Sequence, residues 1–505
     1  MKLQRKVLLT LALVTMGMIT GGKVVSAQNF IPINAANFPD EPVRNALETC
    51  AFYNEEDSEY YEAFRYDYDS GIGYVDTDYS FYLNIGSEDE KVYSVDCLKK
   101  FKNLEGVGIN NLCADSIALE NISRISITQA DVSSLNISCP NVSEVYIEGL
   151  TAVKLTVNTP KTKSVSIGCG ENLTSISFGG MENLESLDIY ETQIKNLDIS
   201  MCPRLKKLSV SNTPVSEIKG LKGLSQLNSF SVYDTNLMSL DVSANKNLQE
   251  LQCSENKKLT SLKGSIALRS VTAESNSNLK TVNVKNSTKL QTLDVKDNKK
   301  LKSIDVSKNT NLKQLLADCT SISKLNMENN KKLTSLSCYQ SKLSKLNVKK
   351  NKKLANLDVS SNKNLKSIDI SKNPNLYKLN VMNTNLKSID VSKNRNLYEL
   401  NVMGTKISKL NLKKNKKLKR LGLDASKVKQ LNLCKQKKFT FCFNIKKGKN
   451  IQLKKFIGTN YKVTQKSKSL SYNKSSGAVK VKKKGWSQIT LKKGKRSFVI
   501  EVYAR

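Results

Sequence analysis

Residues 375–394 have the sequence NLYKLNVMNTNLKSIDVSKN and are followed by the near-copy NLYELNVMGTKISKLNLKKN at residues 396–415. Two near-copies offset by 21 residues indicate a sequence period, and periods of about 20–50 residues are typical of stacked repeat units. Inside each copy, the phrase L-x-x-L-x-V alternates apolar and variable residues as a strand with one buried face does. Each copy therefore predicts one turn of a repeat array that contains a short strand.

The same phrase recurs through most of the chain, at spacings of 20–22 residues. It opens at Leu227, Leu248, Leu268, Leu290, Leu312, Leu333, Leu354, Leu376, Leu397 and Leu418. Leu184 and Leu205 keep the same spacing, weaker units open near Leu104, Ile122, Val142 and Thr162, and FTFCF at 439–443 is the expected last strand. The period therefore predicts about seventeen turns between residues 104 and 445.

Each turn contains a second apolar phrase roughly 11 residues after the first, such as SIDVSKN at 303–309. Units of this size cannot bury an apolar face alone, so they stack into a continuous core with parallel strands. Asn256, Asn298 and Asn362 each follow a first strand, where an Asn side chain can satisfy backbone groups of a turn. The sequence predicts a β-rich solenoid.

The pattern L-x-x-L-x-V/C-x-x-N/T at this spacing resembles a leucine-rich repeat. The segment SLDVSANKNLQELQC at 239–253 resembles the repeats of exported proteins of gut Firmicutes. The region that precedes the repeats in those proteins is similar to INAANFPDEPVRNAL at 33–47. The resemblance covers about residues 33–445. It implies a solenoid whose first strands form a parallel sheet on the concave face, and a binding function whose ligand varies between members.

The N-terminal residues are typical of a secretory signal peptide. Lys2, Arg5 and Lys6 precede the apolar run VLLTLALVTMGMIT, and VVSA at 24–27 is a small-residue cleavage pattern. The apolar run is too short for a membrane span, and no later stretch could cross a bilayer. FVIEVYAR at the C-terminus holds neither a hydrophobic anchor nor a wall-sorting motif. We expect a secreted bacterial protein with no transmembrane anchor, either soluble or retained non-covalently at the cell surface.

Charged residues are distributed unevenly along the chain. The net charge is +36, yet residues 40–96 hold sixteen Asp or Glu and three Lys or Arg, which marks a boundary near residue 100. The predicted organisation is a signal peptide at 1–27, an acidic N-terminal cap at 28–103, the solenoid at 104–445 and a basic β-rich domain at 446–505. Outside the cell, a basic body fits anionic wall polymers better than nucleic acid.

The acidic cap contains YDYDSGIGYVDTD at 66–78. In the resembling family the lead-in runs into an Asp-rich loop like a calcium-binding EF-hand, and Asp67, Asp69 and Asp78 would match its first, third and twelfth positions. Ile72 replaces the Gly that such a loop needs for its bend, and the twelfth position carries Asp instead of Glu. We therefore predict a solvated acidic cap and no metal site, with these three carboxylates as the candidate calcium ligands.

After residue 446 the repeat stops, and short alternating segments are separated by Gly-containing turns. KKKGWSQITLKKGKRSFVIEVY at 482–503 resembles the closing strands of bacterial immunoglobulin-like domains. We expect a small all-β domain that covers the last turn of the solenoid, with Trp486 in its core.

The chain has eleven Cys and no His. Cys253 and Cys338 occupy repeat positions that also take Val or Ile, so we expect most cysteines to be buried free thiols; Cys50 and Cys97, outside the array, are the candidate disulfide pair. The absence of His removes Ser-His and Cys-His nucleophiles and His-based metal sites. We found no Gly-rich phosphate loop, so the sequence predicts no enzyme and no cofactor.

On the implied concave face, the variable residues of each first strand point outward. In the turns that open at Leu227 to Leu418, acidic residues outnumber basic ones at these positions, so this strip is predicted to be neutral to slightly acidic. Exposed aromatic and Met side chains are common binding anchors. The candidate binding residues on or beside the strip are Tyr233, Leu316, Tyr339, Tyr377, Lys378, Met382, Tyr398, Glu399 and Met403. Recent duplication, with these residues kept for packing, is the alternative interpretation of the two near-copies.

The Lys clusters fall in the turns and on the second segment, for example at 299–300, 349–350 and 413–417. They could keep the array soluble and protect its open strand edges, or hold the protein at an anionic envelope. The leading functional prediction is a binding protein whose concave face recognises a protein or glycan. The alternative is an envelope-associated structural protein tethered to anionic polymers by its Lys-rich edges.

Overall fold

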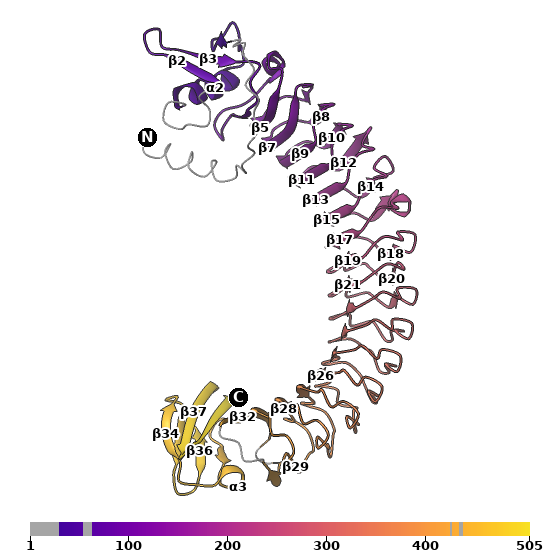
Figure 1. Cartoon of the computed structure of the whole chain (residues 1–505), viewed down its shortest axis with the longest axis vertical. Coiled ribbons are helices and arrows are strands. Elements are labelled where there is room, and N and C mark those ends of the chain that lie inside the picture. The colour runs from indigo at the N-terminus through magenta and orange to yellow at the C-terminus, as the bar shows by residue number, and fades with distance from the viewer. Residues whose placement is uncertain (1–29, 54–62, 425–426, 434–437) are drawn as a thin grey trace.

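Successive turns of the chain stack side by side into an open arc (Figure 1). The computed structural model describes residues 30–53, 63–424, 427–433 and 438–505, and the predicted signal peptide at 1–27 lies outside them. The first strand of each turn joins one parallel sheet on the inner, concave side of the arc, and the second segments lie on the outer side. In the described residues, seventeen strands from β5 to β32 form this sheet. The predicted leucine-rich repeat solenoid of about seventeen turns is confirmed.

The concave sheet begins one strand before the first predicted repeat. Its members in order are β4 (Tyr82–Ile85), β5 (Leu104–Leu112), β7 (Ile122–Ala130), β9 (Glu144–Leu150), β11 (Ser164–Gly170), β13 (Ser186–Thr192), β15 (Lys207–Ser211), β17 (Ser229–Tyr233), β19 (Glu250–Gln252), β21 (Ser270–Thr272), β23 (Thr292–Asp294), β24 (Gln314–Leu316), β25 (Ser335–Ser337), β26 (Asn356–Asp358), β27 (Lys378–Asn380), β28 (Glu399–Asn401), β30 (Arg420–Gly422) and β32 (Lys438–Ile445). Because β4 pairs in parallel with β5, the sheet extends into the predicted cap.

Burial follows the repeat pattern. In the turn that opens at Leu376, the side chains of Leu376, Leu379 and Val381 are buried, whereas Lys378 between them is exposed. The pairing of Leu379 with Leu400 in the next strand places equivalent leucines about 4.8 Å apart along the arc. Each buried leucine contributes about 1.5–3 kcal/mol relative to exposure, so the stacked turns share one continuous core.

The outer side carries shorter, interrupted strand pairs. They are β6 (Ser116–Ile117), β8 (Ser134–Ser138), β10 (Lys154–Asn158) and β12 (Ser175–Gly179), then β14 (Asn196–Asp198) and β16 (Glu217–Lys219), β18 (Ser239–Asp241), β20 (Ser261–Lys263) and β22 (Thr281–Asn283), and β29 (Lys409–Asn411) with β31 (Gln430–Asn432). The second segment at 303–306 forms no paired strand, although Ile304 and Val306 are buried. Outer segments of an arc lie further apart than inner ones, which explains why only the concave sheet is continuous.

A residue with positive φ lies at the end of most concave strands, either as the next-to-last residue of the strand or within three residues beyond it, a feature that the period did not predict. Its φ lies between 44° and 64° in Asn111, Gln129, Cys169, Glu191, Asn212, Asp234, Glu255, Ser275, Asp297, Cys319, Gln340, Ser361 and Asn383, and glycines take the place at Gly149 and Gly404. The backbone N–H of Gln340 donates to the Ser360 carbonyl of the next turn at 2.9 Å. The left-handed residue therefore turns the chain while keeping the ladder between turns. In non-glycine residues this conformation costs about 1–2 kcal/mol.

Two columns of buried asparagines satisfy the turns. The predicted column is confirmed: Asn298, for example, donates to the carbonyls of Ala273 and Val295, both at 2.7 Å. The second column was missed by the sequence analysis and follows the outer segment; its members are Asn245, Asn309, Asn330, Asn351, Asn373, Asn394 and Asn415. Asn373 donates to the carbonyls of Val348 (2.9 Å) and Asn351 (2.8 Å) in the preceding turn. These amide bonds fix the spacing between turns on the outer side.

The N-terminal cap consists of β1 (Phe30–Pro32), helix α2 (Glu41–Tyr53), β2 (Phe64–Asp67), β3 (Ile72–Asp76) and the 3-10 helix η1 (Asp96–Lys100). Residues 66–78 contain an antiparallel hairpin and no helix-flanked loop, since Asp67 pairs with Ile72. Asp67 accepts a hydrogen bond from the Ser70 hydroxyl at 2.6 Å, and Asp78 forms an ion pair with Lys102 at 2.9 Å. No cluster of three potential metal ligands is found in the described residues.

The described cysteines are free thiols, so the candidate Cys50–Cys97 disulfide is not formed. Cys50 lies on α2 and Cys97 in η1, where burial raises the pKa of the Cys97 thiol to about 12. Five of the ten described cysteines are buried and five are half-buried. Burial rather than cross-linking is therefore the common environment, as for small apolar side chains.

The C-terminal domain is built from β33 (Asn450–Gln452), α3 (Lys454–Ile457), β34 (Lys462–Lys466), β35 (Leu470–Asn473), β36 (Ala478–Val481), β37 (Gly485–Lys493) and β38 (Arg496–Ala504). Its core contains Leu470, Ile489, Ile500 and Val502. The prediction that Trp486 belongs to this core is wrong, because its side chain is 62% exposed. Trp486 alternates with the buried Ser487 on β37 and so points away from the core.

Helices are minor in the described residues: α2, the single-turn α3, η1 and a 3-10 turn at η2 (Leu221–Gly223). In that part of the chain, none of the helices combines the length and the apolar character needed to cross a bilayer.

Candidate binding surface on the concave face

The concave sheet presents three rows of outward side chains, because its strands pair in register. At β27, β28 and β30 the first row holds Lys378, Glu399 and Arg420, and the second holds Asn380, Asn401 and Gly422. The third row, just beyond the strands, includes Met382 and Met403. A ligand on this face would therefore meet three parallel rows of side chains whose charge and polarity change from turn to turn.

The structure brings six of the predicted binding residues together in two adjacent turns, on or next to β27 and β28. Tyr377 and Tyr398 stack with ring centroids 4.9 Å apart and an interplanar angle of 12°, and they are 42% and 38% exposed. Lys378 and Glu399 are their sequence neighbours, and the Lys378 Nζ lies 3.9 Å from the Glu399 Oε2. Met382 and Met403 are half-buried at the other end of the strands.

The two methionines are partly engaged by the array itself. The Asn401 amide contacts the Met382 sulfur at 3.7 Å. A Cβ on Gly422 would lie 3.2 Å from the Met403 methyl group, so the Met403 side chain leans over this glycine. The tyrosine pair is therefore the more available half of this cluster.

The other three predicted residues lie apart from that cluster. Tyr233 ends β17 and is 43% exposed, whereas Leu316 on β24 is half-buried and Tyr339 follows β25 with 36% exposure. Strands β19, β21 and β23 separate β17 from β24. The predicted residues therefore form two neighbourhoods and one isolated tyrosine, not one continuous site.

Several concave carboxylates hold the array together. Asp318 accepts from the Tyr339 backbone N–H at 2.6 Å, and Asp424 accepts from the Gly404 N–H at 2.8 Å. Burial raises the pKa of Asp318 and of Asp294. The predicted acidic strip thus offers less free negative charge to a ligand than its composition indicates.

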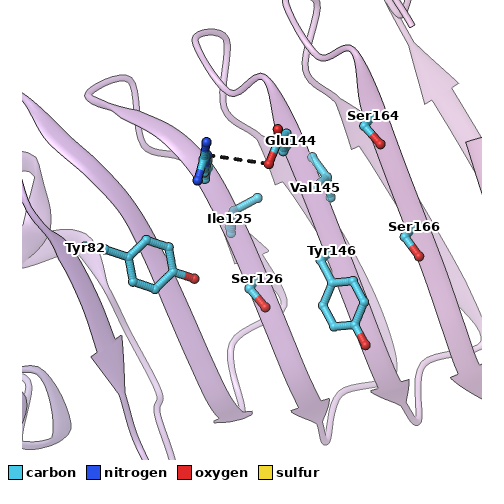
Figure 2. Close-up of a pocket in the computed structure, with 9 residues that line it drawn as sticks. Tyr82, Ile125, Ser126, Glu144, Val145, Tyr146, Ser164 and Ser166 are labelled. Carbon is cyan, nitrogen blue, oxygen red and sulfur yellow. Dashed lines mark ion pairs between the residues drawn. The ribbon is translucent and has the colours of Figure 1, made fainter. Parts of the chain in front are cut away.

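A hollow of about 320 Å³ lies on the N-terminal part of the same face and was missed by the sequence analysis. We call it the N-terminal hollow; it is lined by Tyr82, Arg124, Ile125, Ser126, Glu144, Val145, Tyr146, Ser164 and Ser166. Figure 2 shows the Tyr82 and Tyr146 rings on either side of Ser126. Glu144, which is also labelled there, forms an ion pair with Arg124. The Arg124 Nε lies 3.5 Å from the Glu144 Oε2.

The tyrosines of this region lie over glycines in the neighbouring strands. A Cβ on Gly106 would come within 2.9 Å of the Tyr82 ring, and a Cβ on Gly168 would come within 2.0 Å of the Tyr190 ring. Tyr146 donates a hydrogen bond to Glu148, which raises the pKa of the Tyr146 hydroxyl. The rings are therefore held in place before any ligand arrives, which reduces the entropy lost on binding.

The N-terminal hollow combines ring faces, serine hydroxyls and an exposed ion pair. Tyrosine rings accept apolar faces of a ligand, and the Arg124–Glu144 pair can both donate and accept hydrogen bonds. Its volume lies at the lower end of the range of about 300–1,000 Å³ for small-molecule sites. This arrangement suits reversible binding of one polar ring or side chain.

The sequence did not point to this hollow, because all of its lining residues precede Leu227, where the clear repeats and the compared outward residues begin. Tyr82 also precedes the first counted repeat. The signal that could have found it is the co-occurrence of outward Tyr and outward Gly in adjacent turns, as at Gly168 and Tyr190, which pair across β11 and β13. A glycine beside a tyrosine leaves room for the ring to lie flat on the sheet.

No protein-family model matches the chain, and no curated protein matches it significantly. Among solved structures it is similar to the functional domain of InlJ from Listeria monocytogenes, at 16% identity over 95% of this chain and 100% of that one, with a TM-score of 0.49. It is also similar to an internalin, InlF, from Listeria monocytogenes (19% identity, 54% and 87% coverage, TM-score 0.38). A leucine-rich repeat protein from Leptospira interrogans matches with 16% identity, 66% and 86% coverage and a TM-score of 0.39.

The period, the in-register parallel sheet and the buried leucine columns of this chain make it a leucine-rich repeat solenoid.

Proposed function

We propose that this protein is an exported, non-enzymatic binding protein that recognises a protein or glycan on the concave face of its solenoid, outside the cell or at the bacterial surface. The observation that carries the proposal is the N-terminal hollow, in which Tyr82 and Tyr146 flank a hydroxyl-lined floor. Both rings are half-buried and held by neighbouring residues. Such preorganised aromatic groups are favourable binding anchors.

The Tyr377–Tyr398 stack supports a second contact region on the same face. Its rings are exposed, and a polar pair, Lys378 and Glu399, lies beside them. A ligand long enough to follow the arc could contact both regions, and linked contacts gain affinity through effective concentration.

The test measures binding of the mature protein to an array of purified oligosaccharides and to purified bacterial envelopes. We expect the double change Tyr82→Ala with Tyr146→Ala to abolish the strongest signal, and Tyr377→Ala with Tyr398→Ala to weaken it. Met238→Ala is the matched control, because Met238 is 66% exposed and precedes the outer strand β18. Oligosaccharide binding that survives both double changes would refute recognition by these concave tyrosines.

A second candidate function is an envelope-associated structural role through the Lys-rich edges. The observation that favours it is a column of exposed lysines, Lys350, Lys372, Lys393 and Lys414, each directly before an asparagine of the outer column. None of the four has a carboxylate within 4.0 Å in the described part of the chain. Regularly spaced unpaired cations attract anionic polymers in a salt-sensitive way.

A salt series on the same envelopes separates the two functions. Binding that disappears in moderate salt and ignores the tyrosine changes would favour the lysine column. Changing the four lysines of that column to Gln should then remove the binding, whereas changing four lysines of the N-terminal half, Lys154, Lys163, Lys195 and Lys207, should not.

A further inference from the structure

The concave sheet does not end with the last repeat. Strand β32 pairs in parallel with β38 over eight residues, and β38 pairs antiparallel with β37, which pairs with β34. The C-terminal domain therefore continues the concave sheet beyond the solenoid (Figure 1). Asn444 is in register with Tyr503, so the outward side of β38 belongs to the same face as the third row of the array.

Two large aromatic side chains stand together on this extension. Trp486 and Tyr503 are directly opposite each other in the β37–β38 pair, and cross-strand partners lie on the same face of a sheet. They are 62% and 55% exposed. Their neighbours Ser487 and Val502 fill the core instead, so the two rings form an exposed platform, here called the aromatic platform.

The charge around the aromatic platform is almost entirely positive. Residues 446–505 contain eighteen Lys or Arg and a single Asp or Glu, Glu501. That carboxylate already accepts two hydrogen bonds from Arg420. Lys484 lies just before β37 and Arg505 just after β38, each two residues from a ring of the platform, and both are exposed. Neither has a carboxylate side chain within 4.0 Å among the residues described.

We propose that the aromatic platform, with Lys484 and Arg505, is a binding site for an acidic polysaccharide. The apolar face of a sugar ring stacks on Trp486 or Tyr503, and the sugar's carboxylate or phosphate meets the two cations. The charge of the domain selects an anionic partner, and the exposed rings select one that carries flat-faced ring units. This site lies at the opposite end of the arc from the N-terminal hollow (Figure 1), so it serves retention independently of concave recognition.

Three polymer probes separate ring stacking from charge: polygalacturonate carries both sugar rings and charge, dextran carries rings alone, and poly-L-glutamate carries charge alone. We expect the full chain to bind polygalacturonate most tightly. Trp486→Ala with Tyr503→Ala should weaken that binding at least about tenfold, the usual effect of removing an aromatic anchor. The same change should alter poly-L-glutamate binding less than about twofold.

The remaining variants keep the proposal falsifiable. Trp486→Phe with Tyr503→Phe retains the rings and should restore most of the polygalacturonate affinity, which excludes a folding defect as the cause. Lys484→Gln with Arg505→Gln should weaken polygalacturonate and leave dextran unchanged. Tyr93→Ala is the matched aromatic control, because Tyr93 is 68% exposed in the N-terminal cap and belongs to neither contact region, and it should have no effect on either polymer.

Several outcomes would overturn the proposal. Equal losses for polygalacturonate and poly-L-glutamate in the Trp486→Ala, Tyr503→Ala variant would assign the binding to charge alone. Unchanged polygalacturonate binding in that variant would exclude the platform. Tighter binding to an oligothymidylate or to phosphatidylglycerol vesicles than to polygalacturonate would replace the polysaccharide with a nucleic acid or a lipid surface.

Discussion

The guanidinium of Arg420 donates one hydrogen bond to each carboxylate oxygen of Glu501, at 3.0 and 2.5 Å, across 81 residues of sequence. The Glu501 side chain is only 17% exposed. This two-point geometry is specific to arginine. It joins the last short strand of the array to the C-terminal domain, in the sheet that carries the aromatic platform.

We expect Arg420→Ala to lower the free energy of unfolding of the C-terminal domain by about 1–3 kcal/mol, because Glu501 loses a charged partner. Hydrogen exchange of the β38 amides measures this locally. Lys378→Ala is the control: its ion pair with Glu399 spans 3.9 Å and is exposed, so the change should cost less than about 1 kcal/mol. Equal protection of β38 in both variants would contradict the coupling.

The left-handed positions predict a reciprocal pair of glycine changes. Gln340 has φ of 53°, so Gln340→Gly should raise the free energy of unfolding by about 0.5–1 kcal/mol through relief of backbone strain. Gly404→Gln should lower it by more, because a Cβ there would lie 2.0 Å from the Asn383 amide oxygen. Urea unfolding measures both. A loss of stability in Gln340→Gly would show that the strain is not present.

The outer asparagine column predicts that an Asn→Ala change destabilises the protein far more inside the column than at an exposed asparagine nearby. Asn373→Ala removes the amide that donates to two buried carbonyls. It should lower the free energy of unfolding by about 1–3 kcal/mol for each carbonyl left unpaired. Asn375→Ala removes one exposed bond, to the Lys352 carbonyl at 3.3 Å, and should cost less than about 1 kcal/mol. Limited proteolysis within residues 348–394 would detect the local opening. Similar cleavage in the two variants would count against the column.

Two ion pairs on the outer side predict that the stability of the protein falls at low pH. Hydrogen bonding to Lys219 and Ser200 lowers the pKa of Asp198 to about 2, and hydrogen bonding to Ser371 and Lys349 lowers that of Asp369 to about 2. Both values lie below the ordinary Asp pKa of about 3.9. The stabilisation is therefore complete above pH 4 or so and is lost as the pH falls through about 2. Carboxylate chemical shifts in an NMR titration measure this directly, and a midpoint near 4 for either residue would contradict its pairing.

Much of the fold could be predicted from spacing alone. Each opening leucine, such as Leu376 and Leu397, is buried at the position that the period assigned. The Asn298 turn bonds were also predictable, because a buried amide after a strand has few other roles. Periodicity reports reliably on which side chains face the core, since every turn repeats the same burial.

The candidate site was less predictable. Tyr377 and Tyr398 were placed side by side because they share one repeat position, and the structure stacks them. Trp486 was placed in a core because a lone tryptophan is usually buried, whereas β37 turns it outward. The N-terminal hollow depends on which strands are neighbours of Tyr82, and β4 lies outside the repeat pattern.

The number of turns, the parallel strands and the leucine core could be predicted from the amino-acid sequence, because local alternation and a fixed period leave one stacked arrangement that buries the apolar faces. The pairing of Arg420 with Glu501, the continuation of the concave sheet into the C-terminal domain and the tyrosines that lie over glycines became visible only in the folded molecule. Those features join residues from different turns or domains, and the repeat pattern carries no information about side chains that vary from turn to turn.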